Sequence, residues 1–370
     1  MNPFVIAFLL FLVSANSYLA YRFLTVFSGQ LFVPNYVVCL IWFFLSIAII
    51  VARNDVDFLP NELLDYVYIV GAYWLVIIYY ATILTVFCDV VGVAQRLIGF
   101  EVFKQSAQTT AYGIMFVVAA LLIYGSYNAK HPVVVSYGIT INKPANVDKM
   151  RVVMISDTHF GRISGRQEAK VIVDKINELK PDVVVLCGDT IDSDLKSVQR
   201  KDTLALFKDI DSKFGVYAIM GNHEYLGSEG EREQQYFSSN GINVLIDKAV
   251  VLPNEVVLFG FDDYSQNANK HDFLQKAQEY NDKPLIILDH QPRRREVVEK
   301  IGADMLLCGH THKGQIVPNN LITESIYELD YGYKKFGNLN MIVSCGVGTW
   351  GPPVRIGNQP EIVCIDIDFI

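Results

Sequence analysis

The sequence predicts a two-part protein, in which an all-α bundle of four membrane-spanning helices precedes a layered α/β domain. Charge is distributed unevenly: of 31 Lys and Arg and 39 Asp and Glu, residues 1–129 contain four basic and six acidic side chains. The same part contains four long apolar stretches, whereas the remainder contains short β-branched runs separated by polar segments. We therefore expect a transmembrane anchor over residues 1–130 and a soluble domain over residues 131–370.

The four apolar stretches have the length of membrane spans. They lie at about 3–21, 33–52, 66–88 and 109–129 and contain no charged residue, and each approaches the ~20 residues that cross the hydrocarbon layer as a helix. Buried helices of a large soluble core are the alternative, but no polar sequence in this part could cover them. A cleavable signal peptide fits the first stretch poorly, because Met1–Phe4 has no basic residue and the apolar run continues towards Phe27.

Flanking charges predict the orientation of the spans. Four spans place the N-terminus and the soluble domain on one side of the membrane. Arg22, Arg96 and Lys104 flank the spans on the other side, against Arg53 and Lys130 on the side of the soluble domain. The positive-inside rule then favours an extracytoplasmic soluble domain. The segment 94–105 is either a short interfacial helix or a loop.

Composition limits the partners and the covalent chemistry. The net charge is −8, and no basic stripe is present that could bind a nucleic acid backbone. The six cysteines form no CxxC pair and show no regular spacing, so we expect free thiols rather than a disulfide framework.

The soluble part is expected to contain strands alternating with helices. Residues 166–179 place apolar side chains at helical spacing, which predicts a helix. The last run, 361–369, alternates Ile365, Ile367 and Phe369 with Asp366 and Asp368 and predicts a half-buried edge strand. The runs that predict strands are 133–141, 151–155, 183–187, 216–220, 256–260, 285–288, 305–308, 341–344 and 361–369.

Polar side chains follow five of these runs at the point where each is expected to end. In open α/β sheets, ligands bind beyond the carboxyl ends of the strands, so these side chains are expected to form one site. Each motif alone is common in turns, but their joint placement after buried strands favours a function. The residues are Asp157, His159, Asp189, Asn222, His290, His310 and His312.

This set of side chains is typical of a metal site. Imidazole, carboxylate and amide ligands without thiolate suit divalent ions such as Mn, Fe or Zn. Seven ligands are too many for one ion, and if Asp189 bridges, the other six divide between two. Two ions ~3.5–4 Å apart can hold a hydroxide and stabilise both the attacking and the leaving oxygen of a phosphoryl displacement.

Together the motifs resemble the calcineurin-like metallophosphoesterases, over the whole soluble part. The residues 309–315 and 344–349, with Pro353 and Arg355, are similar to the YkuE/YaeI-type bacterial membrane-associated phosphoesterases, although Lys313 stands where Gly is commoner. The resemblance implies two mixed β-sheets packed between helices. The motifs are Asp157-Thr158-His159, Gly188-Asp189, Gly221-Asn222-His223, His290 and Gly309-His310-Thr311-His312.

The resemblance also implies a role for each site residue. One ion would be bound by Asp157, His159 and His312, the other by Asn222, His290 and His310, with Asp189 bridging both. His223 matches a histidine that contacts the phosphoryl oxygen or protonates the leaving group. Arg355 is a candidate contact for substrate phosphate, because a guanidinium suits two phosphate oxygens.

The function implied is that of a membrane-anchored phosphodiesterase or phosphatase with two divalent metal ions, and lipid-linked or envelope phosphoesters are candidate substrates. The alternative is a membrane sensor or transporter-like protein with a regulatory or inactive domain of this family. The predicted spans contain no charged residue, which counts against a transport path. The complete ligand set counts against an inactive domain.

Overall fold

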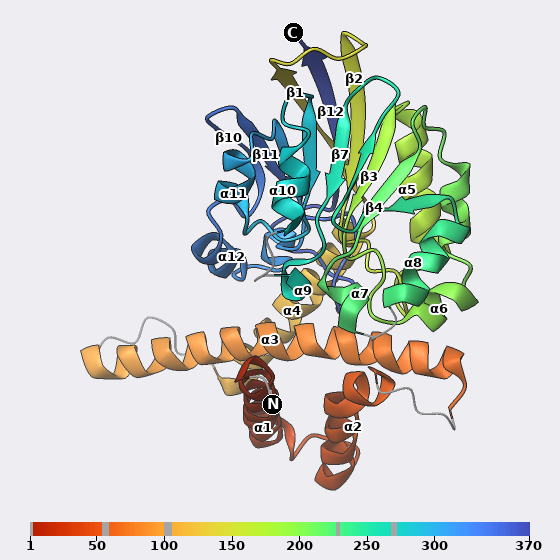
Figure 1. The fold of residues 1–370 in the computed structure, drawn as a ribbon. Helices are drawn as coiled ribbons and strands as arrows, with labels where there is room; N and C mark the ends of the chain where they lie inside the picture. The colour runs from red at the N-terminus through yellow and green to blue at the C-terminus, as the bar shows by residue number, and fades with distance from the viewer. Residues whose placement is uncertain (1–2, 54–58, 100–105, 227–229, 268–271) are drawn as a thin grey trace. The chain divides into compact units, whose positions relative to one another are not determined.

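A computed structural model describes residues 3–53, 59–99, 106–226, 230–267 and 272–370 (Figure 1). The chain divides into two compact units. The first comprises Met1–Ser126 and Gly351–Pro353, and the second comprises Tyr127–Trp350 and Val354–Ile370.

The first unit is helical. Within the described residues, four helices are long and apolar enough to cross a membrane, and one lies at each of the four predicted stretches. The helix α3 extends beyond its predicted span at both ends. Of the segment 94–105, residues 94–98 belong to α3, and residues 100–105 lie outside the described residues. The helices are α1 (Pro3–Phe27), α2 (Asn35–Arg53), α3 (Asn61–Ile98) and α4 (Ala107–Ala129), and the last three residues of α4 belong to the second unit.

Polar contacts join the first three helices. Asn16 on α1 accepts hydrogen bonds from the indole N–H groups of Trp42 on α2 and Trp74 on α3, at 3.1 and 3.0 Å. Arg22 and Asp89 form an ion pair between α1 and α3, at 2.6 Å. Both charges lie directly beyond the predicted spans, in the continuation of the helices. Pairing of opposite charges is the usual arrangement for ionisable residues in membrane helices.

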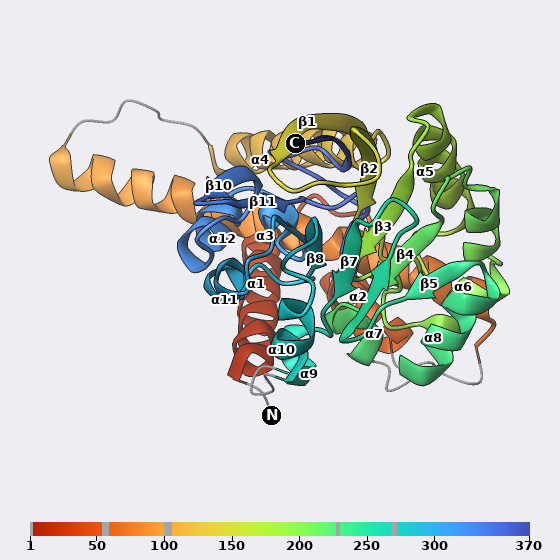
Figure 2. The ribbon, with the colours of Figure 1, turned by 45° about the horizontal axis from the view of Figure 1, so that its top comes forward.

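The second unit contains two six-stranded mixed sheets within the described residues (Figure 2). This confirms the two mixed sheets expected from the resemblance. The first sheet has the order β1 (Val133–Ile141), β12 (Glu361–Phe369), β2 (Lys149–Ile155), β3 (Val183–Cys187), β4 (Val216–Ile219) and β5 (Ile242–Val244). The second has the order β10 (Gly332–Phe336), β11 (Leu339–Val343), β9 (Met305–Cys308), β8 (Leu285–Leu288), β7 (Val257–Gly260) and β6 (Lys248–Val251).

Helices cover the outer faces of both sheets. Figure 1 shows α5 and α8 beside the first sheet and α10 and α11 beside the second. The helices are α5 (Arg166–Glu178), α6 (Leu195–Arg200), α7 (Asn222–Leu226), α8 (Gly230–Ser239), α9 (Tyr264–Asn267), α10 (Asp272–Gln278), α11 (Arg295–Lys300) and α12 (Asn320–Ile326), with the short 3-10 helices η1 (Leu204–Asp209) and η2 (His312–Gly314).

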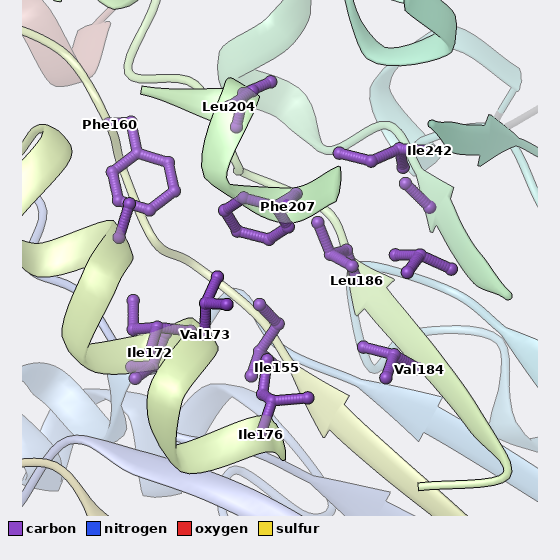
Figure 3. Close-up of a cluster of buried hydrophobic side chains, with 14 of the residues drawn as sticks. Ile155, Phe160, Ile172, Val173, Ile176, Val184, Leu186, Leu204, Phe207 and Ile242 are labelled. Carbon is purple, nitrogen blue, oxygen red and sulfur yellow. The ribbon is translucent and has the colours of Figure 1, made fainter. Parts of the chain in front are cut away.

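The central strands are apolar throughout because both of their faces are buried. Val184 and Leu186 of β3 pack outwards against α5 and η1, in the cluster that Figure 3 shows. Val183 and Val185 of the same strand pack between the two sheets, with residues of β8 and β9. This alternation with a period of two explains why these strands appear in the sequence as continuous β-branched runs.

The prediction that 361–369 is an edge strand was wrong. The strand β12 lies between β1 and β2, parallel to the first and antiparallel to the second. Its first five residues are buried, and only its last four alternate. Asp366 and Asp368 face outwards at this end, where they pair with Arg151 and Lys149 of β2. The charged end of an interior strand therefore resembles an edge in the sequence.

Candidate metal centre

The seven predicted ligands follow strands of both sheets. Asp157 and His159 follow β2, Asp189 follows β3, and Asn222 begins α7 after β4, all in the first sheet. In the second sheet, His290 follows β8, and His310 and His312 follow β9. Within each set the strands are parallel neighbours, so their carboxyl ends lie on one side. The candidate centre therefore lies where the carboxyl edges of the two sheets meet.

A first cluster contains Asp157, His159 and His312. The Nε2 atoms of the two histidines lie 3.0 Å apart, and His312 Nε2 lies 3.4 Å from Asp157 Oδ1. One potential ligand atom from each residue lies within 4.8 Å of the others. All three side chains are buried. Facing imidazole nitrogens and a carboxylate around one point form a suitable set of donors for a divalent cation.

A second cluster contains Asp189, His290 and His310. His290 Nε2 lies 3.1 Å from Asp189 Oδ2 and 3.3 Å from His310 Nδ1. Asp189 Oδ2 also lies 3.8 Å from His159 Nε2 in the first cluster. The Asp189 carboxylate is therefore close to both clusters, as a bridging ligand would have to be.

Asn222 provides an independent test of whether the site fits metal. Its side-chain oxygen is buried and has no hydrogen-bond partner. Buried polar atoms are normally paired, and an unpaired one needs an explanation. A cation bound at this oxygen would supply the missing partner, so the donor set fits a metal centre.

The backbone at the site is strained. Five of the seven predicted ligands have positive φ angles, between 46° and 73°. Non-glycine residues in this region cost of the order of 1–3 kcal/mol each, and such residues cluster at functional sites. Lys313 also has a positive φ, of 47°. It stands where Gly is commoner in the family that the sequence resembles. The five ligands are Asp157, His159, Asp189, His310 and His312.

Two glycines allow the ligands to approach one another. A Cβ atom at Gly221 would lie 2.2 Å from Asp189 Oδ1, and one at Gly309 would lie 2.4 Å from Asp157 Oδ2. Any side chain at these positions would displace a predicted ligand. The glycines before Asn222 and His310 are therefore part of the site and not only turn residues.

Asp192 is a site residue that the sequence analysis missed. Its Oδ1 lies 2.9 Å from His223 Nδ1 and 3.6 Å from His159 Nδ1. Burial alone would raise the pKa of Asp192, but the neighbouring histidines lower it well below its ordinary range. Burial would lower the pKa of His223, but Asp189 and Asp192 raise it to about 9. Asp192 thus orients His223 and favours its charged form.

Glu224 holds the loop after β3. Its carboxylate accepts hydrogen bonds from the backbone N–H groups of Asp189, Thr190, Ile191 and Gly221, at 2.6 to 3.1 Å. The side chain is fully buried. It fixes the conformation from which Asp189 reaches the centre.

Arg355 does not occupy the position expected for a contact to substrate. It is fully buried, and its guanidinium donates to the carbonyls of Gly346 and Gly348 and to Asn358 Oδ1. One of its nitrogens lies 3.3 Å from His312 Nδ1. Because its donors are used inside the protein, Arg355 supports the loop behind His312 and is not available to a phosphate.

Arg293 is an exposed cation close to the centre that the sequence analysis missed. Its guanidinium lies over the rings of Tyr327 and Tyr264, 4.9 and 5.7 Å from their centroids. The ring of Tyr327 lies 6.2 Å from that of His310. A lone Arg after a proline has no distinctive sequence signal, which explains why it was missed.

Comparisons with known proteins show the family of the chain. Residues 150–314 match the family model of the calcineurin-like phosphoesterases. An uncharacterized metallophosphoesterase of Aquifex aeolicus is 30% identical over 264 residues, which are 68% of this chain and 98% of that protein. The fold and the site thus define the class of a metallophosphoesterase. The chain belongs to the calcineurin-like phosphoesterase family.

Other relatives include membrane proteins. A Danio rerio protein named transmembrane protein with metallophosphoesterase domain is 30% identical over 68% of this chain, which corresponds to 61% of that protein's length. A solved dimetal phosphatase from Danio rerio covers 55% of this chain and 89% of its own, with 16% identity and a TM-score of 0.35.

Proposed function

We propose that the chain is a membrane-anchored phosphohydrolase that uses two divalent metal ions. Residues 1–130 would be the anchor and residues 131–370 the catalytic domain. The observation that carries the proposal is the position of Asp189, whose carboxylate lies near both His290 and His159 and thus near both clusters.

The residues around the centre would divide between two ions. Asp157, His159 and His312 would hold one ion, and Asn222, His290 and His310 the other, with Asp189 shared. Two bound ions would neutralise charge on the phosphoryl oxygens and lower the pKa of an attacking water. Manganese, iron and zinc all suit these ligands.

His223 would act on the substrate rather than on a metal. Its Nδ1 faces Asp192, which leaves Nε2 as the atom for a phosphoryl oxygen or the leaving group. A charged imidazole would offset the negative charge that develops there and could protonate the departing oxygen. Arg293, exposed beside His310, is a further candidate for contact with substrate.

The proposal predicts metal-dependent hydrolysis by the purified full-length chain. In detergent or nanodiscs it should hydrolyse a chromogenic phosphodiester or phosphomonoester with added Mn²⁺. A chelator should abolish turnover, and excess Mn²⁺ should restore it. A panel that includes lipid-linked pyrophosphates would identify the preferred ester. Hydrolysis that is insensitive to the chelator would contradict the proposal.

We further propose that the catalytic domain lies on the extracytoplasmic side, from the charges that flank the spans. A reporter that is active only outside the cytoplasm, fused after residue 130, should be active. The same fusion made with a reporter that works only in the cytoplasm should be inactive. The reverse pattern would place the domain in the cytoplasm.

A further inference from the structure

The short helix α12 exposes apolar side chains. None of its described residues is buried. Leu321, Ile322 and Ile326 are 62%, 57% and 53% exposed, and Ile322 and Ile326 lie one helical turn apart on the same face. Thr323 points back into the domain, where its hydroxyl donates to Asp330. The helix thus has a polar side fixed to the protein and an apolar side without a partner among the described residues.

The helix is attached to the turn that carries His312. A Cβ atom at Gly314 would lie 2.3 Å from the backbone nitrogen of Asn320, so the start of α12 presses against the end of η2. Thr311 on the same turn donates to the carbonyl of Asp330, just beyond the helix. After α12, Tyr327 lies beside His310. The exposed apolar side chains therefore belong to the rim of the candidate metal centre, and Figure 1 shows α12 and α7 at the same end of the second unit.

A large aromatic side chain lies beside the same turn. Trp350 exchanges two hydrogen bonds with Gln315, which directly follows η2, at 2.8 and 2.9 Å. The residue is 47% exposed, and its ring lies 6.2 Å from the ring of His223. Trp is enriched where proteins meet the interface between membrane and water.

The chain enters the second unit at Tyr127, and hydrogen bonds link this end of α4 to the same turn. Asn128, in the last turn of α4, is buried and donates to the carbonyls of Arg355 and Asn358, at 3.1 and 2.6 Å. Asn358 in turn donates to the carbonyls of His312 and Lys313, both at 3.2 Å. Asn358 therefore links the end of α4, an apolar helix of spanning length, to the turn beside which α12 and Trp350 lie.

From this convergence we infer that the rim formed by Leu321, Ile322, Ile326 and Trp350 inserts into the surface of the lipid bilayer. The bilayer is the partner we infer for this surface, because the end of α4, the last of the four apolar helices, joins the domain beside this rim. An apolar helix face bordered by polar residues, together with an interfacial Trp, is the usual composition of a surface that lies in the headgroup region. The metal centre would then open towards the lipid headgroups. A second membrane contact, made by the catalytic domain itself, goes beyond the proposed function.

Quenching of site-specific fluorophores tests this inference without any assay of hydrolysis. The full-length chain with Cys39→Ser and Cys88→Ser lacks its two thiols that are not buried. Ile322→Cys and Ile326→Cys would each be labelled with bimane in phosphatidylcholine–phosphatidylglycerol nanodiscs, whose two faces are both open to solvent. Val171→Cys is the matched control, an apolar residue that is 41% exposed on α5.

At position 322 or 326, we expect quenching by brominated lipid and an iodide quenching constant several-fold smaller than at position 171. Lipid quenching at neither position, with iodide quenching equal to that at 171, would overturn the inference and leave a protein partner as the occupant of α12. Because two positions are labelled, one misfolded variant does not leave the question open. A chain without phosphoesterase activity would contradict the proposed function but not this result.

Discussion

Replacing Asp189 by Ala is expected to remove both hydrolytic activity and bound metal. The Asp189 carboxylate lies 3.1 Å from His290 and 3.8 Å from His159, so its loss affects both proposed ion positions at once. Metal ions supply several kcal/mol of transition-state stabilisation, so kcat/KM should fall by at least about 10³-fold. Elemental analysis of the purified protein, together with steady-state kinetics, measures both effects.

Asp174→Ala is the matched control for this experiment. Asp174 lies on the exposed face of α5, where it pairs with Lys170 at 2.8 Å. Exposed pairs of this kind contribute about 0–1 kcal/mol, so activity and metal content should be unchanged. An Asp189→Ala protein that turns over as fast as the control variant would show that the bridging assignment is wrong.

Replacing His223 by Ala is expected to lower kcat while the metal content remains unchanged. His223 is held by Asp192 and is not among the proposed ligands, so the ions should still bind. Loss of a general acid typically costs about 10²–10⁴-fold in rate. Asp192→Asn should lower kcat by less, because the imidazole remains but loses its charged partner.

His131→Ala is the control for the loss of a histidine. His131 is exposed and stacks on Tyr127, and it should be dispensable for turnover. The leaving group provides a second readout: His223→Ala should impair esters with poor leaving groups more than nitrophenyl esters. Metal loss in His223→Ala, or an equal effect on both classes of ester, would exclude the role of a proton donor.

Much of the fold could be predicted because its strands are buried on both faces. β3 and β9 appear as unbroken apolar runs, and Gly188 and Gly309, which directly follow them, mark their ends. Three strands were not predicted. β5 has only three residues, β6 has four, and β10 is an edge strand with Lys334 and Lys335 exposed. Such strands depend on pairing with a neighbour, and charged residues are typical of edges.

The candidate ligands could be singled out because each follows a strand. The seven side chains come from five loops, and only the geometry of the sheets brings them together. Asp192 could not be found in this way, because its contact with His223 bridges 31 residues of sequence. The burial of Arg355 could not be predicted from the sequence either, because it depends on the positions of the carbonyls of Gly346 and Gly348.

Titration of the metal-free, full-length protein with Mn²⁺ tests the two-ion centre most directly. Phosphoester turnover and bound metal would be measured in the same samples as the metal-to-protein ratio rises. A two-ion centre predicts that binding saturates at two equivalents and that turnover appears mainly with the second. Full turnover with a single bound equivalent, or turnover before any metal is bound, would contradict it.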